Sequence, residues 1–111
     1  MRLDIRCLHL DNSEHVARHA RERLAAALQN FQARIERVDV LLEDMHGVKH
    51  GVERCCTVRV AITGASDVLI QHVDPDIYHA IDEAARRMKR TVRRRSNRRR
   101  DIAHHRSVAA R

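Results

Sequence analysis

The residues best able to do chemistry in this sequence are the cations near its C-terminal end. Residues 86–111 contain 12 Lys and Arg and a single acid, Asp101, whereas residues 1–85 contain 10 Lys and Arg against 14 Asp and Glu. Like charges crowded into one segment repel each other, and a polyanion relieves that repulsion. With a net charge of +7 and a pI of about 10.6, this asymmetry predicts nucleic acid as the partner.

The cations are spaced to share one face of a helix. At about 100° per residue, with Ile77 at zero, an apolar stripe covers about −20° to 60°. The stripe consists of Ile77, Ile81, Ala84, Met88 and Val92. The opposite face carries Arg86, Arg87, Lys89, Arg90, Arg93 and Arg94. Guanidinium groups bind phosphates through paired hydrogen bonds, so this face is the candidate RNA surface.

Nine His and three Cys raise the question of a metal site. His15 and His19 lie four residues apart, but the sequence shows no Cys-x-x-Cys and no third ligand beside them, so we expect no metal. The histidines then serve as polar surface groups that add charge near pH 6. Cys55 and Cys56 are expected to be one buried and one exposed strand residue, and all three thiols to be reduced in a cytoplasmic protein.

Catalysis finds no support in the sequence. Asp74, Asp76 and Asp82 fit helix-start and exposed acids, and there is no glycine-rich phosphate loop or nucleophile elbow. We therefore expect no enzyme, cofactor or small-molecule substrate. Tyr78 lies at about 100° beside the apolar stripe, which leaves open a core-edge role or a direct RNA contact. No apolar run approaches the roughly 18 residues of a membrane span.

The elements that position these residues follow from periodicity. Alternating residues predict strands, and apolar spacings of three and four predict two helices. The expected strands cover 1–8, 35–45, 52–63 and 67–73. The first expected helix runs about five turns, from a cap at Asp11 or Ser13 to Phe31, and the second covers about 75–92. The order β-α-β-β-β-α indicates an α+β fold, a four-stranded sheet with two helices packed on one face.

Helix-start residues set the expected boundaries. For the first helix, either Asp11 caps with Glu14 in a capping box or Ser13 caps. For the second, Asp74 caps and Pro75 takes the first helical position. We expect packing to end near the last residue of the apolar stripe. This divides the chain into a domain of residues 1–94 and an Arg/His-rich basic tail of residues 95–111, either a projecting helix end or a flexible segment.

The segment Asp76-Ile77-Tyr78-His79-Ala80-Ile81-Asp82 resembles the last helix of the ribosome hibernation-promoting factor and ribosome-associated inhibitor family. This D-x-Y-x-A-I-D pattern follows a short fourth strand and precedes a basic helix. The first helix is also similar to the family, with Ser13-Glu14, Arg23-Leu24 and a closing Phe31. The resemblance covers roughly residues 1–95, and the chain is similar to a short form of the sigma modulation family.

The resemblance implies a stress-response protein that binds rRNA of the small ribosomal subunit at the decoding region and inhibits translation. It implies a cytoplasmic, non-enzymatic protein, and a monomer because the pairing domain of long forms has no counterpart here. The expected RNA-binding residues are Arg23, Arg86, Arg87, Lys89, Arg90, Arg93, Arg94 and Tyr78. Two alternatives are a general structured-RNA or DNA-binding protein of the same fold without a ribosomal role, and a module whose tail docks on an acidic protein.

Overall fold

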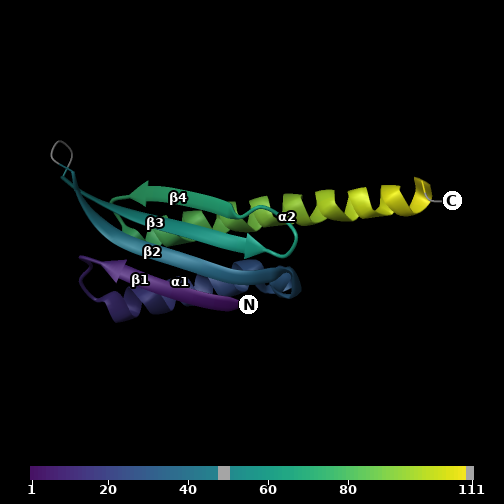
Figure 1. Ribbon diagram of the computed structural model, residues 1–111. Coiled ribbons are helices and arrows are strands. Elements are labelled where there is room, and N and C mark those ends of the chain that lie inside the picture. The colour runs from purple at the N-terminus through teal and green to yellow at the C-terminus, as the bar shows by residue number, and fades with distance from the viewer. Residues whose placement is uncertain (48–50, 110–111) are drawn as a thin grey trace.

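The computed structural model describes the backbone of residues 1–47 and 51–109 and the side chains of residues 1–45 and 53–96. The predicted order of elements and the α+β class are confirmed (Figure 1). The elements are β1 (Arg2–Leu8), α1 (Ser13–Leu28), a short 3-10 helix η1 (Gln29–Arg34), β2 (Ile35–Gly47), β3 (Gly51–Ile62), β4 (Val68–Asp74) and α2 (Ile77–Ala109).

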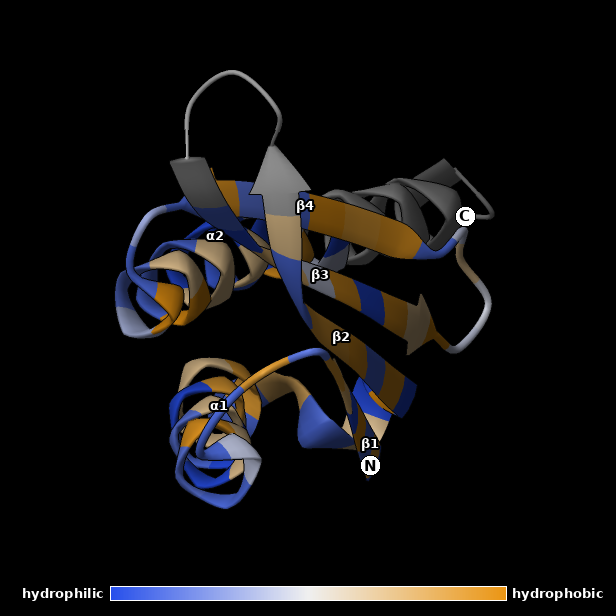
Figure 2. Cartoon of the chain, turned by 90° about the vertical axis from the view of Figure 1, so that its left-hand side faces the viewer, coloured by the Kyte–Doolittle hydropathy of each residue, from blue (hydrophilic) through white to orange (hydrophobic). Residues whose placement is uncertain are grey.

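The four strands form one sheet in the order β1-β2-β3-β4. β1 pairs with β2 in parallel, while β2–β3 and β3–β4 are antiparallel. The parallel pair requires a crossover, which α1 provides. Both helices cover the same face of the sheet and leave the other face open, as expected (Figure 2).

The core between sheet and helices is aliphatic, because the chain has one Phe, one Tyr and no Trp. Each strand contributes alternate residues, and each helix contributes one stripe. The largest buried members of this cluster are Leu24, Leu28, Leu42, Ile81 and Met88. All five residues of the predicted α2 stripe are buried. The remaining face of α2 is therefore available for contacts outside the protein.

The predicted start of α1 is wrong. Neither Asp11 nor Ser13 caps the helix; Asn12 occupies the N-cap position in a left-handed conformation, with φ 56° and ψ 38°, and makes no side-chain cap hydrogen bond. The short loop after β1 reverses direction through two left-handed residues, His9 and Asn12. Asn tolerates this conformation better than most residues because its side chain is short and polar.

The predicted start of α2 lies two residues too early. Asp74 is the last residue of β4, paired with Arg54 of β3, so it cannot be the helix cap. Its Oδ1 instead accepts the N–H of Asp76 at 2.9 Å. Asp76 is the cap, because its own Oδ1 accepts the N–H of Tyr78 at 2.9 Å. Pro75 consequently lies before the helix.

Packing along α2 continues one turn beyond Val92. Ser96 is buried, and its carbonyl oxygen accepts a hydrogen bond from Arg34 Nη1 at 3.4 Å. Arg95 Nη1 donates to the carbonyl oxygen of Ser66 at 2.8 Å. The boundary expected at residue 95 thus falls within α2, which extends past the sheet (Figure 1). The flexibility of residues 95–111 stays a prediction.

The prediction for the adjacent cysteines is half wrong. Cys56 faces the core, but Cys55, on the opposite side of β3, is also fully buried. Cys55 lies between Glu43 of β2 and Val73 of β4 in the strand register, so neighbouring side chains cover it without a helix. Both cysteines are free thiols. Burial raises the pKa of Cys56 to about 12, which keeps that thiol protonated.

Candidate nucleic-acid interface

Six predicted cations lie along α2 on the side away from the core. Five of them are exposed and Lys89 is half-buried. Two make contacts within the protein: Arg86 Nη2 lies 2.7 Å from Glu83 Oε2, and Arg87 Nη1 donates to the carbonyl oxygen of Gln71 at 2.9 Å. These contacts hold the two guanidinium groups in place and engage part of their donor capacity.

The other four α2 cations form the outer cation row, defined as Lys89, Arg90, Arg93 and Arg94. Among the residues whose side chains are described, none gives them a hydrogen bond or an ion pair. No carboxylate among the described side chains pairs with their donors. This row is therefore the part of the interface most available to an external anion.

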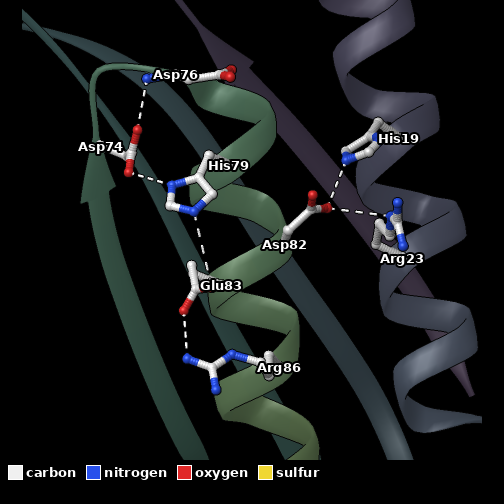
Figure 3. A network of polar contacts seen from close by, with 8 residues as sticks. All are labelled: His19, Arg23, Asp74, Asp76, His79, Asp82, Glu83 and Arg86. Atoms are coloured by element: carbon white, nitrogen blue, oxygen red, sulfur yellow. Dashed lines mark hydrogen bonds and ion pairs between the residues drawn. The ribbon is translucent and has the colours of Figure 1, made fainter.

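Arg23 reaches the same surface from α1. Its Nε lies 3.2 Å from Asp82 Oδ1, and His19 Nε2 lies 2.8 Å from the same oxygen. Figure 3 shows both α1 side chains pointing at this one carboxylate of α2. Asp82 therefore joins the two helices, and Arg23 of α1 lies beside α2.

A second polar chain runs along the first turns of α2 (Figure 3). His79 Nδ1 lies 2.5 Å from Asp74 Oδ2, and its Nε2 lies 4.0 Å from Glu83 Oε1. The carboxylate of Asp74 raises the pKa of His79. In return, the N–H of Asp76 first and then His79 lower the pKa of Asp74, and Arg86 lowers the pKa of Glu83. These groups favour their charged forms and fix the start of the helix.

Tyr78 lies at the junction between the two helices. Its side chain is 38% exposed, and its ring meets that of His19 edge to face with centroids 5.0 Å apart. The structure thus brings Tyr78 and Arg23 to the same side of α2. In the described part of the chain the Tyr78 hydroxyl has no hydrogen-bond partner, so it is free to bind outside the protein.

Sequence reasoning did not identify His19 as a partner of α2, and it interpreted Asp82 as an exposed acid. A usable pattern was present, because His19 and Arg23 are four residues apart on α1, as Tyr78 and Asp82 are on α2. In the packed structure, the pair on α1 and the pair on α2 lie on the helix edges that face each other. The pairing itself required the relative placement of the helices.

Other kinds of site find no support in the residues that the structure describes. No group of three or more His, Cys, Asp or Glu side chains there could hold a metal ion. No helix over residues 77–109 or elsewhere in the described chain is long and apolar enough to cross a membrane. The surface around α2 remains the strongest candidate.

Comparison with known proteins supplies independent findings. The sequence profile of the family described as sigma 54 modulation protein / S30EA ribosomal protein matches residues 3–100. No curated protein sequence matches. The resemblance drawn from the D-x-Y-x-A-I-D segment is confirmed by the family match.

Two solved structures share the fold. The N-terminal domain of Thermus thermophilus Protein Y has a TM-score of 0.67 at 22% identity, covering 85% of this chain and 98% of that one. A ribosomal subunit interface protein from Coxiella burnetii has a TM-score of 0.73 at 13% identity, covering 87% and 99%. The architecture is therefore one that is found in other solved proteins.

Proposed function

Because the chain belongs to the sigma 54 modulation protein / S30EA ribosomal protein family, we propose that it binds the small ribosomal subunit and inhibits translation as a hibernation factor. The observation that carries this proposal is the outer cation row, four cations on one helix that have no partner among the side chains that the structure describes. Arg23, which contacts Asp82 of α2, adds a fifth cation from α1.

The proposed mechanism is occlusion. Guanidinium groups along α2 bind rRNA phosphates at the decoding region, and the body of the protein then fills the path of messenger and transfer RNA. The chain has one Tyr, one Phe and no Trp for stacking on single-stranded bases, which suits recognition of folded RNA by shape and backbone. Arg86, Arg87 and Tyr78 are proposed as supporting contacts at its edges.

The proposal extends to catalysis, cellular location, oligomeric state and the response to stress. The description of the matched family names a ribosomal protein, and we infer that this protein acts on the ribosome without catalysis, a cofactor or a small-molecule substrate. We also infer a cytoplasmic monomer that responds to stress. Each of these is accessible to direct measurement on the purified chain.

The test is co-sedimentation with small ribosomal subunits through a sucrose cushion at physiological salt, with excess duplex RNA as competitor. We compare R90E/R94E with R18E/R21E, a matched double reversal at two exposed positions of α1. Loss of two phosphate contacts lowers the slope of log affinity against log salt by about 1.8. We expect only R90E/R94E to release the protein.

A general structured-RNA-binding protein is the second candidate, and the observation that favours it is that the chain has one Tyr, one Phe and no Trp for reading single-stranded bases. Retention on the subunit despite the competitor supports the ribosomal role. Loss of the intact protein to duplex RNA, with both double variants still folded by circular dichroism, supports the general binder instead.

A further inference from the structure

The sheet face opposite the helices contains a second group of cations. Arg2, Arg6, Arg37 and Arg59 line an open hollow of about 760 Å³ there. We call this surface the arginine trough; its lining also includes Asp4, Asp39, Leu41, Thr57 and Leu69. Neither helix covers it (Figure 2).

The trough is formed by all four strands, and its four arginines come from β1, β2 and β3. Arg2 of β1 lies opposite Arg37 of β2. In the next row on this face, Asp39 of β2 lies between Asp4 of β1 and Arg59 of β3. Adjacent strands are separated by about 4.8 Å, so cations on β1 and β3 lie about 10 Å apart across the sheet.

Two of the four arginines are held by the carboxylates. Asp4 Oδ2 lies 3.2 Å from Arg2 Nε and 3.9 Å from Arg37 Nη2, and Asp39 Oδ1 lies 2.9 Å from Arg37 Nε. The side chains of Arg2 and Arg37 still remain 74% and 53% exposed. The two acids therefore orient these guanidinium groups and leave their outer donors free.

The other two arginines lack such partners. Arg6 and Arg59 are exposed, and no described side chain forms an ion pair with either. Four cations against two acids leave the trough with an excess of two positive charges. Leu41 lies between Arg6 and Thr57 in the strand register, and Leu69, 57% exposed, lies beside Arg59 on β4, so the floor offers apolar surface of the kind that a planar base covers.

We propose that the arginine trough binds a single-stranded RNA segment, so that the protein contacts RNA on two opposite faces. Arg forks match phosphate geometry, and guanidinium planes and the Leu69 side chain can stack on unpaired bases. An acidic peptide would satisfy the charges but would leave the apolar floor without a planar partner. This inference goes beyond the proposed function, because the trough does not depend on what the helices bind.

The test counts binding sites with labelled 12-nucleotide oligo(U) by fluorescence anisotropy at low salt, using the full chain. We expect two sites on the intact protein, one on R6Q/R59Q and one on the helix variant R90E/R94E. When R6Q/R59Q is added to R90E/R94E, the affinity of the trough for oligo(U) should fall about tenfold or more. The magnitude of the slope of log affinity against log salt should fall by about 1.4.

The matched control is R18Q/R21Q, which removes the same charge from exposed positions on α1. Two sites on this variant support the trough, whereas a loss equal to that of R6Q/R59Q means that net charge alone binds the oligonucleotide and overturns the proposal. Displacement of oligo(U) by a poly-Glu peptide of equal charge also overturns it. Co-sedimentation of R6Q/R59Q with small subunits reports separately on the proposed function.

Discussion

Removal of the Asp82 carboxylate should change stability and RNA binding in opposite directions. The carboxylate pairs with His19 and Arg23 across the helix interface, at 2.8 Å and 3.2 Å. The three side chains are 40%, 23% and 59% exposed, so solvent screens both pairs. At about 0.5 kcal/mol for each screened pair, Asp82→Ala should cost about 1 kcal/mol. For a domain of this size, that lowers the Tm by about 5 °C.

The gain in RNA binding follows from the loss of the repulsion between the Asp82 carboxylate and a phosphate that Arg23 binds. A phosphate held by the outer side of its guanidinium group would lie about 7 Å from the Asp82 carboxylate. In a water-like dielectric this repulsion is about 0.6 kcal/mol, so its removal strengthens binding about threefold at low salt. At physiological ionic strength the gain falls to about 1.5-fold, since the Debye length is about 8 Å.

The assay combines thermal unfolding by circular dichroism with anisotropy of a labelled 16-base-pair RNA duplex. Asp67→Ala is the control, because it removes one exposed acid from the β3–β4 turn without breaking a contact between the two helices. We expect Asp67→Ala to keep the Tm of the intact protein and to change affinity less than Asp82→Ala. Weaker RNA binding by Asp82→Ala would refute the reasoning, since it would mean that the carboxylate is needed to place Arg23 for the RNA.

Three further predictions concern stability and reactivity. Because the pKa of His79 is raised, its pairing with Asp74 stabilises the fold fully below about pH 6.5 and less as the pH rises through the folded-state pKa. The difference in unfolding free energy between the protein and His79→Gln should therefore shrink between pH 6 and pH 9. A constant difference would argue against the pair. Leu24→Ala removes a fully buried side chain and should cost about 2–5 kcal/mol in urea unfolding, whereas a cost below 1 kcal/mol would place Leu24 outside the core. Iodoacetamide at pH 8 should label half-buried Cys7 well before Cys56, whose pKa is about 12; equal rates by mass spectrometry would contradict its burial.

Much of the fold could be predicted because periodicity reports burial directly. The two-residue alternation of Val38, Val40 and Leu42 and the helical spacing from Ile77 to Val92 each mark a face that the structure buries. The same spacing places the α2 cations on the opposite face. These features are local, so a single sequence contains them.

The errors arose where a residue's role depends on distant partners. Asp74 has the right chemistry for a helix cap, but its pairing with Arg54 keeps it in β4. Asp76 is the residue that caps α2. Cys55 alternates as an exposed residue should, yet its neighbours on the open face cover it. The link between Asp82 and α1 likewise needs the packing of two helices, which no local pattern specifies.

The parallel pairing of β1 has a consequence for how the chain folds during its own synthesis. β1 is an edge strand whose only strand partner, β2, begins more than 25 residues after β1 ends. During synthesis β1 and α1 therefore emerge with nothing to pair against, while β2, β3 and β4 can pair in succession. Strands β2, β3 and β4 and the start of α2 should fold as one cooperative unit. In the folded protein β1 should be the first strand to open, because no residue of β1 is fully buried.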